Sequence, residues 1–288
     1  MLTREETHVI LKSCNCDLSS INELGSLGSM TNRNVLFEAN GQKFVLRRAG
    51  EGSSELVNRT NEYKTYCAIQ RYNLSDKIVF IDPESGIKIT EFIEGARTCD
   101  SNNIDDVTLC MNKLHVLHDL KLHVPHTFDL FAMIDYYEYL RGHKSMYDDY
   151  SEVKQRVETL KFYLPKTQDD FCLTHIDPNQ DNFLITKSDV RLIDWEYAAM
   201  QDPHVDIAMF AIYAGYNEDQ IKSLIEIYFG EKPSEKIMCQ IYSYIAICGL
   251  LWSNWCEYKK KCGIDFGDYA KSQYEYARKF SRCTEWNM

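Results

Sequence analysis

Two short stretches decide how this chain is interpreted: HIDPNQDN at residues 175–182 and LIDWEY at residues 192–197. Asp177 is followed five residues later by Asn182, and Asp194 closes a short apolar run that is typical of a strand. Phosphoryl transfer from ATP needs a carboxylate that orients the attacking hydroxyl and takes its proton, and oxygen ligands that hold Mg²⁺ against the phosphates. The spacing therefore predicts Asp177 as the base and Asn182 and Asp194 as magnesium ligands.

The composition is that of a globular protein. The chain has 288 residues, of which 44% are hydrophobic and 26% charged, and a formal net charge of −11. That apolar content is too high for a disordered chain, and the length is sufficient for one large domain or two lobes. The acidic balance argues against a nucleic-acid binder, whose surface would be basic, and suits a cationic ligand.

No targeting or membrane segment is expected. The first eight residues are charged and lack the apolar core of a signal peptide. The longest apolar stretches, around residues 207–216 and 245–252, fall short of the ~20 residues that span a bilayer. Eleven scattered cysteines are an odd number without disulfide or zinc spacing, which indicates reduced thiols. We therefore expect a cytoplasmic protein without membrane insertion.

The first part of the chain has the pattern of a small antiparallel sheet with one helix. Residues 35–39 and 43–47 are rich in strand-forming residues, and Asn40-Gly41 between them predicts a tight hairpin. Residues 55–72 have helical composition. Strand character returns at residues 77–81 and 86–93, which are joined by a turn sequence.

After Gly95 the pattern becomes mainly helical. Residues 103–119, 130–143 and 151–163 are amphipathic helix candidates, and the chain from Asp202 onward is also helical in character. Three short strand-like runs interrupt this region: 171–174, 183–186 and 190–193. Asp177, Asn182 and Asp194 therefore lie on loops between short strands, where catalytic side chains are often held.

The motif H-x-D-x-x-x-x-N followed by I-D-W-E-Y resembles the choline kinase and aminoglycoside phosphotransferase superfamily, which is related to the protein kinases. The resemblance implies an α+β fold with two kinase-like lobes. The N-lobe, residues 1–94, would bind nucleotide with an antiparallel sheet and one main helix. The C-lobe, residues 95–288, would be mainly helical and carry the catalytic loop, the metal and the substrate. ATP and Mg²⁺ are the expected cofactors.

The resemblance also implies the nucleotide contacts. Arg47 would grip the phosphates, held by Glu62 on the next helix, while Arg48 points to the other face of the strand. The backbone of Glu91 and Ile93 would hold the adenine. His175 is grouped with Asp177 and shapes the catalytic loop. The loop that covers the phosphates would comprise Gly25, Gly28, Ser29, Met30, Thr31 and Asn32, with Ser29 where a second glycine is common.

Aromatic residues near the C-terminus resemble those of bacterial choline kinases of the phosphocholine-decorating type. Trp252 and Trp255 are three residues apart and share one helix face, which would equally suit a core stripe. A quaternary ammonium has no N–H to donate and is held by aromatic faces. The implied choline site comprises Glu196, Tyr197, Tyr213, Trp252, Trp255, Phe266 and Tyr269.

Two further positions bear on this site. Asp206 is expected to buttress the catalytic loop by hydrogen bonds. Tyr213 stands seven residues later, where some choline kinases carry a carboxylate, which weakens the case for ethanolamine.

The predicted reaction is ATP-dependent phosphorylation of choline. One alternative is a kinase for another small amino alcohol or an aminoglycoside, for which Glu257, Asp265 and Asp268 are available carboxylates. The other is a catalytically inactive kinase-like binding module, against which Asp177 and Asp194 argue. The oligomeric state stays open.

Overall fold

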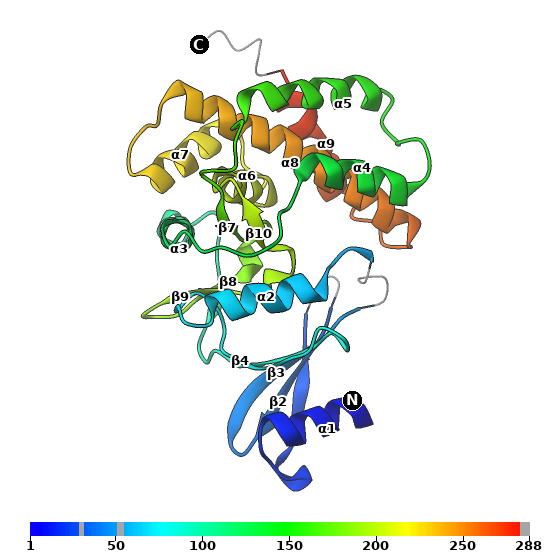
Figure 1. The fold of residues 1–288 in the computed structure, drawn as a ribbon, viewed down its shortest axis with the longest axis vertical. Helices are drawn as coiled ribbons and strands as arrows, with labels where there is room; N and C mark the ends of the chain where they lie inside the picture. Colours follow the sequence, from blue (N-terminus) through cyan, green and yellow to red (C-terminus); the bar gives the residue numbers. More distant parts are fainter. Residues whose placement is uncertain (29–31, 51–54, 283–288) are drawn as a thin grey trace. The chain divides into compact units, whose positions relative to one another are not determined.

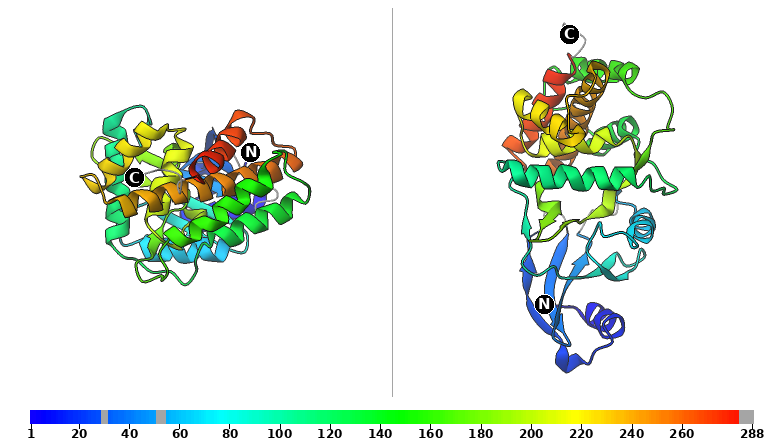
Figure 2. Two further views of the ribbon diagram at one scale, coloured as in Figure 1. Left: turned by 90° about the horizontal axis from the view of Figure 1, so that it is seen from above. Right: turned by 90° about the vertical axis from the view of Figure 1, so that its left-hand side faces the viewer.

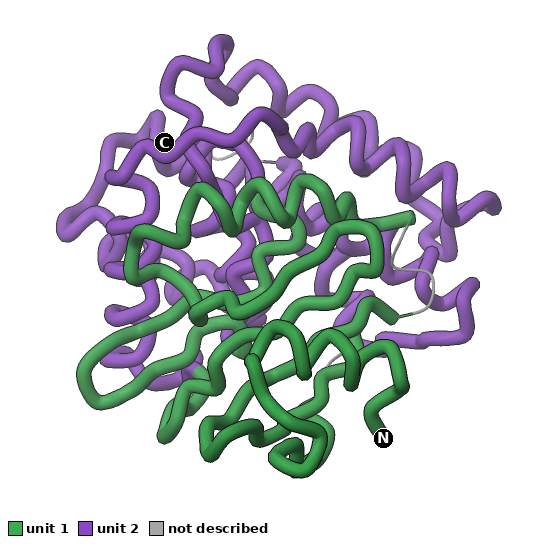
Figure 3. Tube along the Cα trace, turned by 60° about the horizontal axis from the view of Figure 1, so that its bottom comes forward, with its two compact units in different colours: residues 1–98, 181–198 green, residues 99–180, 199–288 purple. Residues whose placement is uncertain are grey.

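The computed structural model describes residues 1–28, 32–50 and 55–282 (Figure 1). It contains two compact units (Figure 3). Unit 1 comprises residues 1–98 and 181–198, and unit 2 comprises residues 99–180 and the chain from residue 199 onward. The expected lobe boundary between residues 94 and 95 does not divide the chain into these two units, because residues 181–198 belong with the N-terminal part.

Unit 1 is built on a five-stranded antiparallel sheet with the strand order β1-β2-β3-β5-β4. The predicted hairpin at Asn40-Gly41 is confirmed: both residues have positive φ, as a tight hairpin turn between twisted strands requires. The strands are β1 (Asn22–Leu27), β2 (Arg33–Ala39), β3 (Gln42–Arg48), β4 (Ile78–Ile81) and β5 (Ile87–Glu91).

One face of this sheet is apolar and packs against α1 (Arg4–Ser13) (Figure 1). Alternate residues of β2, β3 and β5 are buried there and form a core cluster with Ile10 of α1. One main helix was expected in this region, and α1 is an additional helix that was not predicted. Thr3 and Glu6 form a capping box at its N-terminus, and that local signal would have revealed the helix.

The opposite face of the sheet carries charged side chains toward α2 (Arg59–Ile69). Arg47 of β3 and Lys88 of β5 stand directly opposite each other in the strand register, and both are buried. The helix is shorter than the expected 55–72. It starts later because Asn58 caps its N-terminus by accepting a hydrogen bond from the Asn61 N–H, and it ends at Ile69.

A small three-stranded sheet in the order β6-β8-β9 explains why residues 181–198 belong to unit 1. In it β6 (Arg97–Thr98) pairs with β8 (Phe183–Ile185), which pairs with β9 (Val190–Leu192). The Leu192 N–H also donates to the Leu74 carbonyl, at 2.8 Å. The strand-like runs expected at 183–186 and 190–193 are thus present as a hairpin.

Unit 2 is mainly helical, as expected. The central helix α8 packs against α4, α6 and α9 (Figure 2). A two-stranded sheet pairs β7 (Cys172–Thr174) with β10 (Ala199–Gln201). The helices are α3 (Ile104–Asp119), α4 (Leu130–Arg141), α5 (Tyr150–Thr159), α6 (His204–Tyr213), α7 (Glu218–Phe229), α8 (Glu235–Lys261) and α9 (Asp268–Phe280).

By length and composition, α8 is the one helix in the described residues that would suffice to cross a membrane. The apolar runs at residues 207–216 and 245–252 are shorter than α8, because α8 also includes polar residues. Because 83% of its most apolar window is buried inside the protein, α8 fits the description of a core helix.

Candidate active site

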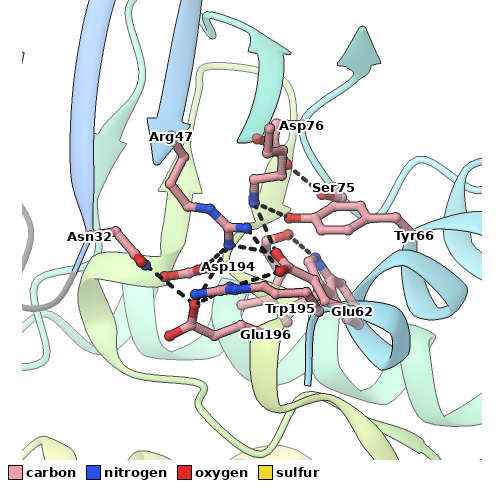
Figure 4. A network of polar contacts seen from close by, with 12 residues as sticks. Asn32, Arg47, Glu62, Tyr66, Ser75, Asp76, Asp194, Trp195 and Glu196 are labelled. Carbon is pink, nitrogen blue, oxygen red and sulfur yellow. Dashed lines mark hydrogen bonds and ion pairs between the residues drawn. The ribbon is translucent and has the colours of Figure 1, made fainter. Parts of the chain in front are cut away.

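Arg47 and Glu62 form a buried, bidentate ion pair in unit 1 (Figure 4). The Arg47 Nη1 and Nη2 atoms lie 2.5 and 2.8 Å from the two carboxylate oxygens of Glu62 on α2. Arg48, the next residue on β3, points away and pairs with Glu5 of α1. The expected pairing of Arg47 with Glu62 is therefore present, and strand alternation explains why Arg48 does not take part.

Lys88 adds a second buried cation next to this pair. Its Nζ donates to the hydroxyl of Tyr66 at 2.6 Å and lies 3.7 Å from a Glu62 oxygen. Burial alone would raise the pKa of Glu62, but the charges of Arg47 and Lys88 lower it to about 2. Glu62 is thus held ionised between two cations that the strand register brings together.

Asn182 and Asp194 are brought together by the β8–β9 hairpin. Phe183 pairs with Leu192, and the Ile193 N–H donates to the Asn182 carbonyl at 2.9 Å, so the two predicted ligands flank one end of the hairpin. Asp194 has a left-handed backbone with φ 64°, and its Oδ1 lies 3.4 Å from Arg47 Nη1. A carboxylate and an amide oxygen are the donors that Mg²⁺ prefers, so this pair fits the ion.

Glu196 is buried and bound by cations of the same unit. Its Oε2 lies 2.9 Å from Arg59 Nη1, 3.5 Å from Arg47 Nη1 and 3.3 Å from Asn32 Nδ2 (Figure 4). Burial and the neighbouring Asp194 carboxylate raise the pKa of Glu196. The Glu196 carboxylate is thus engaged by partners within unit 1. Its role in a substrate site stays a prediction.

Arg59 was missed by the sequence analysis. Its Nη1 also lies 2.8 Å from Glu62, three residues along α2, and this spacing was the available signal. The polar cluster of unit 1 therefore comprises three cations, Arg47, Arg59 and Lys88, and three carboxylates, Glu62, Asp194 and Glu196.

In unit 2, Asp206 fixes the backbone that precedes Asp177. Its two carboxylate oxygens accept the N–H groups of His175 and Ile176, at 2.8 and 2.7 Å. Ile176 has φ 69°, a left-handed conformation that is costly for a β-branched residue and needs such support. The predicted buttressing role of Asp206 is confirmed, and His175 is fully buried beside Asp177, which is half-buried.

A second layer of contacts holds Asp206 itself. His118 Nε2 lies 2.9 Å from Asp206 Oδ2, and His118 Nδ1 lies 2.8 Å from the hydroxyl of Tyr228. Because the Asp206 carboxylate accepts this contact, His118 Nε2 carries the hydrogen that points at it.

Five of the predicted substrate residues form one ring group in unit 2. Successive ring centroids are 5.9 Å apart for Tyr213–Trp252, 5.6 Å for Trp252–Trp255, 5.0 Å for Trp255–Phe266 and 6.2 Å for Phe266–Tyr269. Burial, Cys256 and the charge of Asp177 raise the pKa of Tyr269, so the Asp177 carboxylate acts electrostatically on this member of the ring group. Tyr197 belongs instead to unit 1, in the turn Trp195–Tyr197.

The remaining predicted nucleotide residues are placed as follows. Gly25 lies within β1, beside a β-bulge, so the connection to β2 is shorter than the expected 25–32. Gly28 is exposed, and Ser29, Met30 and Thr31 lie outside the described residues. Glu91 ends β5, where its N–H donates to the Lys77 carbonyl, and Ile93 follows the strand.

Comparison with known proteins supports this architecture. The family model for choline/ethanolamine kinase matches residues 25–278. The protein LicA of Haemophilus influenzae is 28% identical over 267 residues, which cover 88% of this chain and 78% of the relative.

Solved structures agree with these matches. The choline kinase LicA from Streptococcus pneumoniae is 28% identical, with a TM-score of 0.81 over 97% of this chain and 99% of that chain. A structure of LicA in complex with AMP, also 28% identical, has a TM-score of 0.79 over 97% and 98% of the two chains. The kinase-like α+β fold is thereby established, and the chain belongs to the choline/ethanolamine kinase family.

Proposed function

We propose that this small-molecule kinase transfers the γ-phosphoryl group of ATP to the hydroxyl of choline, giving phosphocholine. The observation that carries the choice of choline is the ring group of Tyr213, Trp252, Trp255, Phe266 and Tyr269 in the same unit as Asp177. A trimethylammonium group offers no hydrogen-bond donor, and aromatic faces bind it by cation–π attraction. The similarity to the choline kinase LicA from Streptococcus pneumoniae supports the same substrate.

The polar cluster of unit 1 is suited to the triphosphate. Arg47, fixed by Glu62, would hold phosphate oxygens with its remaining N–H capacity. Asn182 and Asp194 would hold Mg²⁺, which when bound neutralises the negative charge of the phosphates. The backbone of Glu91 and Ile93 would hold the adenine, in keeping with the AMP complex of LicA.

Asp177 would orient the choline hydroxyl and take its proton as the oxygen attacks the γ-phosphorus. The reaction requires that this carboxylate keep one position. The two hydrogen bonds from His175 and Ile176 to Asp206 fix the backbone that positions it. Preorganisation of this kind removes the reorganisation that a mobile loop would need.

The carboxylates that an aminoglycoside site would need are already engaged. Glu257 accepts hydrogen bonds from the Ser145 hydroxyl and the Met146 N–H. Asp265 pairs with Lys260 and Asp268 with Lys271, at 2.9 and 3.0 Å. Together with the ring group, this favours a ligand with one quaternary ammonium over one with several protonated amines.

A coupled ADP-release assay tests the proposal. The purified protein is given ATP and Mg²⁺ with choline, ethanolamine, an aminoglycoside or no acceptor. Choline should give the highest kcat/KM, and phosphocholine should form in equal amount with ADP. Higher kcat/KM for ethanolamine or the aminoglycoside, or ADP release that no acceptor stimulates, would contradict the proposal.

A further inference from the structure

Lys259 is a buried lysine at the end of the ring group. It is 4% exposed, and its Nζ lies 5.6 Å from the centroid of the Trp255 ring. Trp252, Trp255 and Lys259 are spaced i, i+3 and i+7 on α8, so one helix face carries two indole rings and then this ammonium. Neither the family resemblance nor the proposed reaction assigns this residue a role.

Within the described residues, the Lys259 ammonium forms no ion pair and no hydrogen bond. The neighbouring lysines differ: Lys260 pairs with Asp265 at 2.9 Å, and Lys261 donates to the Leu140 carbonyl at 2.9 Å. Glu257, the carboxylate nearest in sequence, is bound by Ser145, Met146 and Arg141. The charge of Lys259 is therefore not neutralised by a carboxylate.

A lysine side chain in a buried position without a carboxylate partner is unfavourable, and two features compensate in part. The face of Trp255 attracts the cation, and the negative end of the α8 dipole, which ends at Lys261, favours positive charge. The ammonium consequently raises the electrostatic potential at the same ring that would receive the substrate cation.

We propose that Lys259 is a specificity residue that limits how much positive charge the ring group accepts. This inference rests on the proposed binding of choline at these rings. A ligand with one quaternary ammonium is bound despite repulsion by Lys259, because its methyl groups gain aromatic contact. A polyamine brings several charges and little apolar surface, and the repulsion excludes it.

The variant Lys259→Met tests this by removing the charge while keeping an apolar side chain of similar length. Choline KM should fall about three- to tenfold, which corresponds to about 0.6–1.4 kcal/mol. Spermidine, tested as a competitive inhibitor, should bind the variant at least about tenfold more tightly than the wild type, because each of its charges is repelled. Lys259→Arg keeps the charge and should retain the wild-type values.

Two controls separate charge from packing. The neutral carbon isostere of choline, 3,3-dimethylbutan-1-ol, should bind wild type and Lys259→Met equally. Lys260→Met, which removes a neighbouring exposed lysine, should leave choline KM unchanged, and thermal unfolding verifies that each variant is folded.

Three results would overturn the role of Lys259: an unchanged or raised choline KM in Lys259→Met, a parallel shift for the neutral isostere, or equal spermidine inhibition, or none, in both proteins. A wild-type enzyme that does not use choline would instead overturn the proposed function, and this inference with it.

Discussion

The polar cluster of unit 1 and the ring group of unit 2 both combine buried and half-buried side chains, but opposite interactions stabilise them. In unit 1, three cations and three carboxylates neutralise one another at distances of 2.5–3.7 Å. In unit 2, the centroids of successive neutral rings are 5.0–6.2 Å apart, and Lys259 is the cation beside these rings. The first arrangement depends on charge balance, and the second depends on apolar contact.

This difference predicts how each region responds to change. Removal of one charge from unit 1 leaves a buried partner unpaired, which is strongly destabilising. Replacement of one ring by a smaller ring in unit 2 leaves no charge unpaired and alters only contact area and π-attraction. Variants of the unit 1 cluster should therefore lower catalysis and stability together, whereas conservative variants of the unit 2 rings should change substrate binding without changing stability.

The largest effect is expected at the proposed base, Asp177, and at the proposed metal ligand Asp194. Asp177→Ala should lower kcat by about 10²–10⁴ with ATP KM largely unchanged, because the base is lost but the nucleotide contacts are not. Asp194→Ala should abolish Mg²⁺-dependent activity by removing a metal ligand. Steady-state kinetics and nucleotide binding by calorimetry measure both. Asp170→Ala, at an exposed carboxylate of unit 2, is the control, and near wild-type kcat in Asp177→Ala would contradict its assignment.

The charge balance of unit 1 is broken most directly at Arg47. Arg47→Ala should raise ATP KM and destabilise the protein by about 3–5 kcal/mol, because Glu62 is then buried without its bidentate partner. Arg47→Lys should restore part of the ATP use and part of the stability, because lysine keeps the positive charge but lacks the bidentate guanidinium group. Chemical denaturation and ATP kinetics measure the two effects.

Arg48→Ala is the matched control for Arg47, since Arg48 is on the other face of β3 and pairs with the exposed Glu5. The double variant Arg47→Met/Glu62→Met should regain stability but not ATP use. If Arg48→Ala weakened ATP use more than Arg47→Ala, the assignment of the phosphate-binding arginine would be wrong.

Acid titration tests the same cluster without the cavity that truncation of a side chain would create. The pKa of Glu62 is lowered from its ordinary 4.5 to about 2, so its ionised form stabilises the fold above about pH 4.5. That contribution, on the order of 3 kcal/mol, is lost as the pH falls from about 4.5 toward 2. Glu62→Gln should therefore show a flatter loss of unfolding free energy over this range than the wild type. Glu5→Gln is the control, and an equally steep acid limb in Glu62→Gln would refute the argument.

Features with a local sequence signal were predicted from the sequence. The Asn40-Gly41 hairpin, the main helices and the strand-like runs near residues 183 and 190 follow from turn chemistry and periodicity. Strand alternation predicted that only one of Arg47 and Arg48 faces the nucleotide, and the choice of Arg47 with Glu62 as its partner followed from family resemblance. The helix α1 was missed even though its capping box is a local signal.

Features that depend on tertiary neighbours were not predicted. Lys88 is buried because β3 and β5 are adjacent, although it follows its cross-strand partner Arg47 by 41 positions in the chain. Arg59 contacts Glu196 across 137 residues of sequence. The assignment of residues 181–198 to unit 1 rests on the pairing of β6 with β8. No local pattern encodes such contacts, because strand order and register are set by the whole fold.

The smallest effect is expected at the rings of unit 2, and Trp255 is the cleanest position. The Trp252 Nε1–H donates to the Met209 sulfur at 3.0 Å, whereas the Trp255 Nε1 has no hydrogen-bond partner in the described residues. Trp255→Phe therefore removes indole area without breaking a hydrogen bond. A π-face contributes about 0.5–2 kcal/mol to binding of a desolvated cation, so choline KM should rise about 2- to 30-fold. ATP KM should not change, and the melting temperature should stay close to that of the wild type.

Phe is preferred to Ala at this position, because truncation of a buried Trp would add a cavity cost of about 3–5 kcal/mol. A purely structural role for the ring predicts the reverse pattern, a lowered melting temperature with choline KM unchanged. Both quantities measured on one preparation decide between the roles, and an unchanged choline KM in both Trp255→Phe and Trp252→Phe would exclude the ring group as the choline site.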